Sequence, residues 1–176
     1  MTGVHHVKIP VTDLQRSVTW YCDLMDLLLW REFIEDDELR GAALKSEEGG
    51  FSFGLRLRAH CASTPDLTGF DVVSLHMATR ESLELVRNRC ADLGATHTEI
   101  ADRRANEAVV DVTDPDGTVL RFYWEGPSDQ LDVFSGVVFH GDGRPELVRE
   151  PRLAAPRVGG RPAHGASAVA LPSWPR

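Results

Sequence analysis

Imidazole, cationic and phenolic side chains stand at alternate positions in the β-rich stretches of this sequence. One stretch carries His6 and Lys8, and a later one carries Arg121 and Tyr123. Because side chains at positions i and i+2 of a strand share one face, each pair would point to the same side of a sheet. Imidazole titrates near neutral pH, and guanidinium binds carboxylates through two parallel hydrogen bonds. These residue types suit acid-base chemistry and the binding of an anion.

The first elements that could position these residues are a strand, a helix and three more strands. The stretch 4–11 is rich in β-branched residues and predicts a strand. Thr12, with Gln15 three residues later, predicts the N-cap of a helix. The apolar stripe of that helix is formed by Leu14, Val18, Tyr21 and Met25. Three further strands are predicted at 27–33, 40–44 and 51–58.

The same order of elements then repeats, which predicts an internal duplication. A strand is predicted at 70–78, and Thr79 is a candidate helix cap. The helix ends at Gly94, a residue type favoured at helix C-termini, and its apolar stripe is formed by Leu83, Val86, Cys90 and Leu93. Three more strands follow at 97–100, 108–112 and 118–124, the last two joined by the turn Asp114-Pro115-Asp116-Gly117.

These repeats divide the chain. We predict one domain over 1–126, with module one at about 3–60 and module two at about 68–126. An extension is predicted at 127–153. The remainder, 154–176, is rich in Pro, Gly, Ala and Arg and predicts a tail without a core of its own.

Composition excludes several classes of function. The net charge of -8 argues against nucleic acid as a partner, because phosphate binding requires a surplus of Lys and Arg. The chain has no run of roughly 18 apolar residues that would span a membrane, so we expect a cytoplasmic protein without membrane partners. Three widely spaced cysteines, Cys22, Cys61 and Cys90, favour reduced thiols that pack in the structure.

Two separated motifs resemble the vicinal oxygen chelate superfamily, the glyoxalase, bleomycin-resistance and dioxygenase group. The first runs from His6 through Val11 to Leu14 and continues with Trp20-Tyr21; the second is the Asp114-Pro115-Asp116-Gly117 turn followed by Leu120 to Tyr123. The resemblance implies an α+β fold in which two tandem βαβββ modules form a curled, eight-stranded cup. It also implies a homodimer, because the cups of this superfamily are often completed or flanked by a second chain.

The resemblance further implies four positions for metal ligands, which we compared one at a time. His6 matches the first position, but the second falls on Gly54 and the fourth on Arg121. The third falls on Val72 or, with a shift of one residue, on Asp71. Glycine offers no ligand, and arginine would repel a cation. We therefore expect no metal ligand set and no cofactor; a divalent metal is the alternative if these positions are misplaced.

Strand alternation predicts which side chains line the cup. The predicted substrate-binding residues are Lys8, Arg56, Ser74, His76, Arg121 and Tyr123, and the predicted catalytic residues are His6 and Tyr123. Several of these residues are cationic although the chain is acidic, which favours an anionic ligand. In the alternative interpretation, the cations pair with Glu32, Asp71 or Asp111 inside the cup, or they lie in water at the ends of the strands. Because neighbouring strand residues point to opposite faces, only one of His5 and His6 can enter the cup. The resemblance implies that it is His6, so His5 is assigned to the outside.

Three functions remain open. The first is a metal-free protein that binds or sequesters an anionic small molecule in a cationic cup. The second is a glyoxalase-like enzyme, either a metal-independent isomerase, epimerase or cyclase, or a metal-dependent lyase or dioxygenase. The third is an interaction module whose cup is filled by side chains. Equilibrium binding without turnover would distinguish the first from the second. Fold-level resemblance does not decide between them.

Overall fold

Each module has the order strand, helix and three further strands that the duplication predicts. In this computed structural model the structure describes residues 4–47, 50, 52–104, 106–127, 136–139 and 145–148. Module one contains β1 (His6–Val11), α1 (Leu14–Met25), β2 (Leu28–Glu35), β3 (Glu38–Lys45), β4 (Ser52–Leu57) and a short 3₁₀ turn, η1 (Arg58–His60). Module two contains β5 (Asp71–His76), α2 (Glu81–Leu93), β6 (Ala101–Arg104), β7 (Glu107–Thr113) and β8 (Val119–Glu125).

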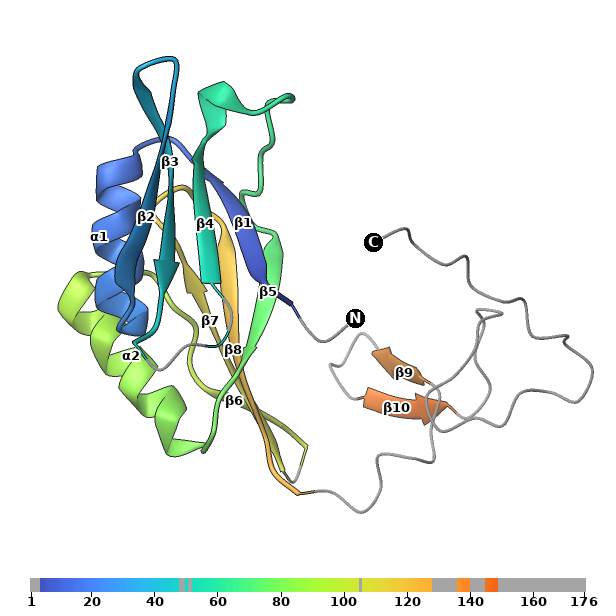
Figure 1. The fold of residues 1–176 in the computed structure, drawn as a ribbon. Coiled ribbons are helices and arrows are strands. Elements are labelled where there is room, and N and C mark those ends of the chain that lie inside the picture. Colours follow the sequence, from blue (N-terminus) through green and yellow to red (C-terminus); the bar gives the residue numbers. More distant parts are fainter. Residues whose placement is uncertain are drawn as a thin grey trace, which may run out of the picture. The chain divides into compact units, whose positions relative to one another are not determined.

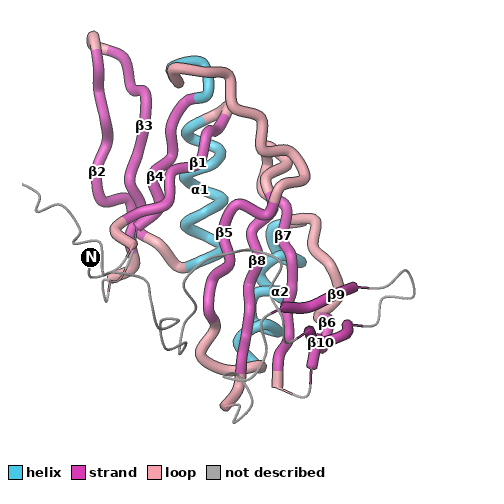
Figure 2. Tube along the Cα trace, turned by 90° about the vertical axis from the view of Figure 1, so that its right-hand side faces the viewer, coloured by secondary structure: helices cyan, strands magenta, loops and turns pink. Residues whose placement is uncertain are grey.

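Each module forms a four-stranded sheet with the same topology. The strand orders are β1-β4-β3-β2 and β5-β8-β7-β6, so the last strand of each module lies parallel to its first. Both helices lie on the same side of the sheets, as Figure 1 and the turned view in Figure 2 show. The predicted α+β fold of two βαβββ modules is confirmed. Its eight strands form two sheets that are not closed into a barrel.

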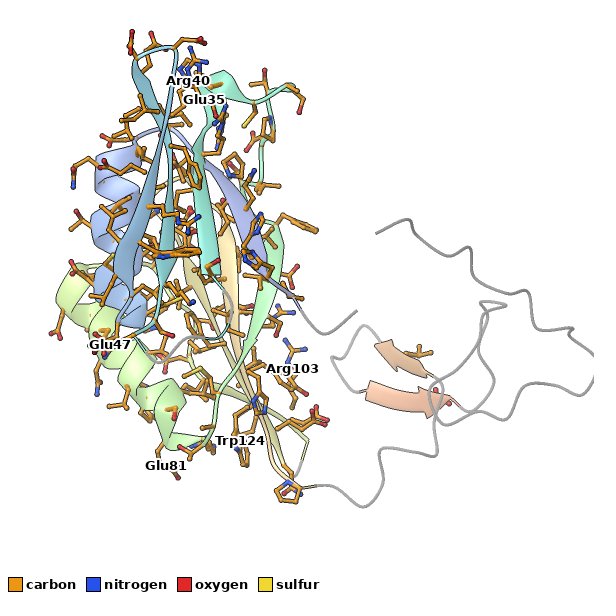
Figure 3. The ribbon with its side chains drawn as sticks, in the orientation of Figure 1. Glu35, Arg40, Glu47, Glu81, Arg103 and Trp124 are labelled. Carbon is orange, nitrogen blue, oxygen red and sulfur yellow. The ribbon has the colours of Figure 1, made fainter. Side chains whose placement is uncertain are left out.

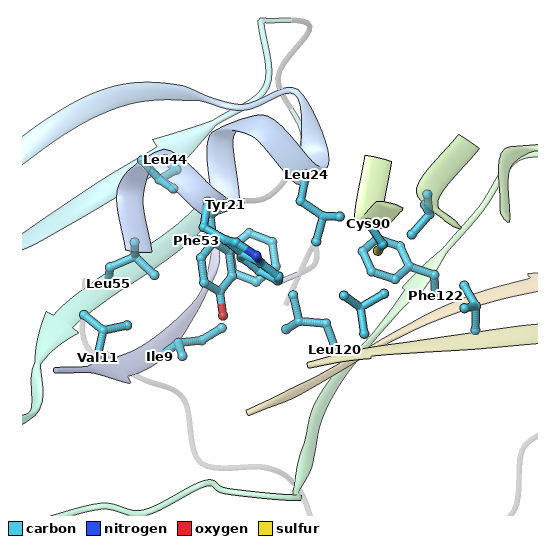
Figure 4. Packing of buried hydrophobic residues seen from close by; sticks show 14 of the residues in the cluster. Ile9, Val11, Tyr21, Leu24, Leu44, Phe53, Leu55, Cys90, Leu120 and Phe122 are labelled. Carbon is cyan, nitrogen blue, oxygen red and sulfur yellow. The ribbon is translucent and has the colours of Figure 1, made fainter. Parts of the chain in front are cut away.

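The core lies between the helices and the sheets. Helix α1 contributes Tyr21 and Leu24, and α2 contributes Cys90, all almost fully buried. These residues pack with Phe53 of β4 and Leu120 of β8 in a single cluster (Figure 4). Since α1 and α2 cover one face of the sheets, the alternate residues of the strands are left on the opposite face.

Helix α1 begins one residue later than predicted. Asp13 is its N-cap and accepts a hydrogen bond from the backbone N–H of Arg16, so the prediction of Thr12 as the cap is wrong. Thr12 instead donates its backbone N–H to Asp116, at 3.0 Å, and its hydroxyl to the same carboxylate. Arg16 also donates to Asp116, over 3.0 Å. These contacts join the start of α1 to the turn before β8.

The sixth strand also lies later in the chain than predicted. The stretch 97–100 pairs with β7 only through an isolated bridge between His97 and Val112. There the backbone N–H of Asp111 donates to the Thr98 hydroxyl, so a side chain replaces part of the regular ladder. The continuous strand therefore begins at Ala101. Helix α2, by contrast, ends at Gly94 in the left-handed conformation, as predicted.

The chain divides into two units, residues 1–127 and 128–176. In the second unit, β9 (Gly136–Phe139) pairs with β10 (Pro145–Val148) as an antiparallel hairpin. The predicted tail at 154–176 lies outside the described residues.

Cys22, Cys61 and Cys90 are free thiols, and burial raises the pKa of Cys90 to about 11. None of the described helices is long and apolar enough to cross a membrane.

Candidate functional site

A cavity of about 540 Å³ lies over the face of the first sheet that is turned away from α1. We call it the first-sheet cavity. It is lined by all four strands of module one and by His5, which precedes β1. Its lining residues are His5, His6, Lys8, Trp30, Arg31, Phe33, Glu35, Ala42, Ala43, Ser52, Gly54, Leu55 and Arg56. Its volume falls in the range of small-molecule sites.

Small residues keep the floor of this cavity open. In the β3–β4 ladder Ala43 lies opposite Gly54, and in the β1–β4 ladder Gly54 lies opposite Lys8. A Cβ atom added at Gly54 would lie 3.8 Å from side-chain carbons of both His6 and Lys8. The missing side chain of Gly54 therefore leaves space between His6 and Lys8, where the implied second metal ligand would have stood.

Strand β2 supplies an aromatic wall. Trp30 and Phe33 both line the cavity, although their side chains are 42% and 45% exposed. The guanidinium of Arg31 lies 4.1 Å from the ring centre of Trp30, and the ammonium of Lys45 lies 5.1 Å from it. Cations at these distances are attracted to the face of an indole ring. An aromatic ligand would find both ring surface and positive charge here.

Arg56 lines the cavity as predicted, but it already has an anionic partner. Its two terminal nitrogens donate to the two carboxylate oxygens of Glu35, over 2.5 and 2.8 Å. These hydrogen bonds lower the pKa of Glu35 and raise the pKa of Arg56. Glu35 and Arg40 lie together at the end of the β2–β3 hairpin in Figure 3, where Arg40 also contacts Asp36 over 3.0 Å. For Arg56, the alternative interpretation, pairing within the protein, describes the structure, although Glu35 was not among the partners considered.

Lys8 differs from Arg56 in having no such partner. Within the described part of the chain, neither Lys8 nor Arg31 contacts a carboxylate. Lys8 is exposed and lines the cavity beside Gly54. Its ammonium is therefore free to bind an anion that enters the cavity.

The remaining predicted residues lie on the second sheet. Register places Ser74 opposite Arg121 and His76 opposite Tyr123, so the four share a face as predicted. They are not among the residues that line the first-sheet cavity. Their assignment to a substrate site, and that of Tyr123 to catalysis, stay predictions.

Arg121 is held by two carboxylates. It donates two hydrogen bonds of 2.8 Å to Asp111 and lies 2.7 Å from an oxygen of Asp71. The hydrogen bonds that Arg121 donates to Asp111 are the main cause of the raised pKa of Arg121. The alternative interpretation was that the cations of the cup pair with carboxylates such as Asp71 and Asp111. Arg121 does form both of these ion pairs.

The donor set does not fit a divalent metal. Of the implied ligand positions, Gly54 has no donor atom, while Arg121 and Asp71 bind each other. The described residues contain no group of three or more His, Cys, Asp and Glu side chains that could hold a metal ion. His6 alone would bind a metal weakly. No chemical step is therefore assigned to a metal here.

His5 is the residue that sequence reasoning missed. Its Nδ1 lies 3.0 Å from the Nδ1 of His6, with the two rings edge to face, and both rings line the cavity. His5 was assigned to the outside by strand alternation, but β1 begins at His6, so alternation does not apply to His5. The adjacent pair His5-His6 was the available signal.

Comparison with known proteins agrees with this architecture. The family model described as the Glyoxalase/Bleomycin resistance protein/Dioxygenase superfamily matches residues 3–122. Divalent metals are common in this superfamily. No curated protein matches the sequence.

Three solved structures illustrate the likeness. A glyoxylase/bleomycin resistance protein/dioxygenase domain from Frankia sp. EAN1pec is 22% identical, with a TM-score of 0.58, and the match covers 72% of this chain and 99% of that one. Lactoylglutathione lyase from Agrobacterium tumefaciens is 11% identical, with a TM-score of 0.57 and coverage of 70% and 94%. An antibiotic binding protein from Streptomyces sp. CB03234 is 16% identical, with a TM-score of 0.56 and coverage of 72% and 98%. At these identities the likeness shows the fold alone.

Proposed function

Because the chain belongs to the Glyoxalase/Bleomycin resistance protein/Dioxygenase superfamily, we propose that it binds and sequesters an anionic organic molecule in the first-sheet cavity. One observation carries this proposal. The cavity combines Lys8, a cation without a carboxylate partner among the described residues, with the aromatic wall of Trp30 and Phe33. Charge and ring surface together favour an aromatic carboxylate over a neutral or purely aliphatic compound. A cytoplasmic location and the absence of a bound metal are parts of the same proposal.

A binding role is consistent with the antibiotic binding protein among the similar structures. Gly54 in the cavity floor supports the binding of a flat ring, because it places no side chain between His6 and Lys8. The open second candidate, a metal-independent isomerase, is favoured by a different observation, the contact between the rings of His5 and His6.

A homodimer belongs to the proposed function. Six large apolar side chains are exposed on β2 and β3, namely Leu28, Leu29, Trp30, Phe33, Ile34 and Leu39. Strand β2 is also the edge of its sheet, so its outer backbone groups have no strand partner in the first sheet. A second copy that packs on this strand would cover the apolar residues and narrow the opening beside Trp30 and Phe33.

Calorimetric titration with phenylacetate and with its neutral amide, phenylacetamide, tests the binding proposal. The carboxylate is expected to bind at least tenfold more tightly, because a charge-assisted hydrogen bond contributes about 1.5 to 3 kcal/mol. The variant Lys8→Met should reduce this preference, and Lys8→Met combined with Arg31→Met should abolish it, because both cations line the cavity. The matched control is Arg103→Met, which removes an exposed cation from β6 on the other sheet (Figure 3). Equal affinity for acid and amide, or an unchanged preference in Lys8→Met, would refute the anion site.

A further inference from the structure

The side chains of His5 and His6 lie within hydrogen-bonding distance of each other. Their Nδ1 atoms are 3.0 Å apart, and the rings meet nearly at right angles, with an interplanar angle of 85°. A hydrogen bond between two ring nitrogens requires that one carries the hydrogen and the other offers a lone pair. The two rings must therefore be different tautomers in the neutral pair.

This hydrogen bond also determines which of the two Nε2 atoms carries a hydrogen. The ring that donates through Nδ1 has a lone pair on Nε2 and is a base there. The ring that accepts at Nδ1 carries its hydrogen on Nε2 and is an acid there. The neutral pair thus offers one proton acceptor and one proton donor, although both residues have the same chemical structure.

The fold holds the pair in place at the cavity. The carbonyl of His5 accepts two hydrogen bonds from Ser52, one from the backbone N–H over 3.0 Å and one from the hydroxyl over 3.2 Å. His6 lies opposite Ser52 in the β1–β4 ladder. Ser52 is itself buried, with 5% of its surface exposed. It is a positioning residue for both imidazoles, which line the same cavity as Lys8.

We propose that His5 and His6 form an acid-base dyad that interconverts the keto and enol forms of an aromatic carboxylate. The inference rests on the binding part of the proposed function and puts turnover in place of sequestration, because Lys8 must hold the carboxylate and Trp30 and Phe33 the ring. The substrate class therefore has three parts: an aromatic ring, a carboxylate and a carbonyl group with a hydrogen on the neighbouring carbon.

The reaction balances without an oxidant or a reductant. The basic Nε2 takes the proton from the carbon beside the carbonyl group, and the C–H electron pair becomes the C=C bond. The carbonyl π electrons take a proton from the acidic Nε2 of the other ring, which gives the enol. The Nδ1 proton then moves between the rings and restores a neutral pair with the two roles exchanged. Such a dyad can serve the reverse reaction equally well.

Charged side chains surround the dyad. Lys8 of β1, Arg31 and Glu35 of β2 and Arg56 of β4 line the same cavity, and Glu35 is paired with Arg56. Lys8 and Arg31 are therefore the cations of the cavity that can attract the carboxylate of the substrate.

Phenylpyruvate is a suitable probe because it has all three parts. The full-length protein, with chelator present, is expected to accelerate exchange of the C3 protons of phenylpyruvate in D₂O, followed by proton NMR. His5→Gln, His6→Gln and the double variant should each lose the acceleration to the same extent, because the two residues act as one unit. His97→Gln, which changes a half-buried histidine outside the cavity, is the matched control. Lys8→Met should raise the half-saturating concentration more than it lowers the rate at saturation.

Calorimetry with phenylpyruvate separates the two proposals. Binding without acceleration would overturn the dyad and leave the binding function intact, while absence of binding would overturn both. Full activity in either single histidine variant would also overturn the dyad. A second test uses only the unaltered protein: ¹⁵N NMR of the histidine rings should show one Nδ1–H and one Nε2–H tautomer for this pair. Two Nε2–H tautomers would refute the shared proton even if the variants failed to fold.

Discussion

The phenol of Tyr21 on α1 donates a 2.9 Å hydrogen bond to the carboxylate of Asp114, which precedes β8 and lies 93 residues later in the chain. Both side chains are buried. The other oxygen of Asp114 accepts the backbone N–H groups of Asp116 and Thr118. Burial raises the pKa of Tyr21 well above its ordinary value, so the phenol stays protonated and remains a donor. One buried contact thus joins the helix of module one to the last turn of module two.

Tyr21→Phe should lower the free energy of unfolding by about 1 to 3 kcal/mol, because it leaves an oxygen of Asp114 buried without its partner. The ring itself would keep its contacts with Trp20 and Phe53, at centroid distances of 5.0 and 5.6 Å. Urea unfolding measures the loss. A double-mutant cycle with Asp114→Asn isolates the pair; equal stability of Tyr21→Phe and the unaltered protein would show that the contact contributes nothing.

The order of elements could be predicted because its signals are local. Apolar spacing marked both helices, and Gly94 marked the end of the second. The cap of α1 could not be predicted, since Thr12 and Asp13 are both good capping residues. The choice depends on Asp116, which binds Thr12 from 104 residues away. Only the folded arrangement of the two modules brings that carboxylate to the start of α1.

Gly54 controls access to the cavity floor. Gly54→Leu would place a branched side chain between His6 and Lys8 and should weaken phenylacetate binding at least tenfold, as calorimetry would measure. Gly54→Ala should leave stability almost unchanged, because the new Cβ atom would make ordinary contacts at 3.8 Å. Gly41→Ala is the contrasting control: its Cβ atom would lie 2.9 Å from the Leu55 carbonyl oxygen, so this variant should unfold at lower temperature. If Gly54→Leu bound phenylacetate as tightly as the unaltered protein, the ligand could not lie on this floor.

Strand alternation predicted correctly that His6, Lys8, Gly54 and Arg56 share one face, because that inference requires only a period of two residues. It could not predict which cations are already paired. Glu35, the last residue of β2, reaches Arg56 from a strand two places away in the sheet. His5 was misplaced because the first residue of a strand cannot be fixed to one position from the sequence.

The Glu35–Arg56 pair should make stability depend on pH. The folded-state pKa of Glu35 is lowered, chiefly by the hydrogen bonds from Arg56. Its contribution to stability is therefore present above the unfolded pKa, about 4.3 for glutamate, and is lost as the pH falls through the lower, folded value. Glu35→Gln should lower the melting temperature at pH 7, and the difference from the unaltered protein should shrink below about pH 4. Glu47→Gln, another exposed site in module one, is the control; a difference for Glu35→Gln that is independent of pH would contradict the linkage.

Arg121 is expected to stabilise the second sheet. Arg121→Met would leave Asp111 and Asp71 facing each other without the cation between them. Stability should fall by about 1 kcal/mol, a modest loss because these partly exposed charges are screened by water. Thermal unfolding measures the change, and a smaller loss when Asp71→Asn is also present would identify repulsion between the aspartates as its cause. If Arg121→Met instead weakened phenylacetate binding at unchanged stability, the predicted role of Arg121 in ligand binding would stand.

The proposed homodimer can be tested at a residue that does not line the cavity. Ile34 of β2 is 64% exposed, and its position on the edge strand places it in the surface that a second copy would cover. A charge at a buried interface position remains without a partner and is costly. Ile34→Glu should therefore convert the dimer to a monomer in sedimentation experiments at micromolar concentration.

Leu85 of α2 provides a control of equal exposure. It is also 64% exposed, but it lies on a helix, on the opposite side of the sheets from the first-sheet cavity. Leu85→Glu introduces the same charge and should leave the dimer intact. The two variants together separate a local effect on β2 from a general effect of added negative charge on a chain whose net charge is already -8. A dimer that survives Ile34→Glu but dissociates in Leu85→Glu would place the interface on the helices, and a monomer in the unaltered protein would exclude the homodimer altogether.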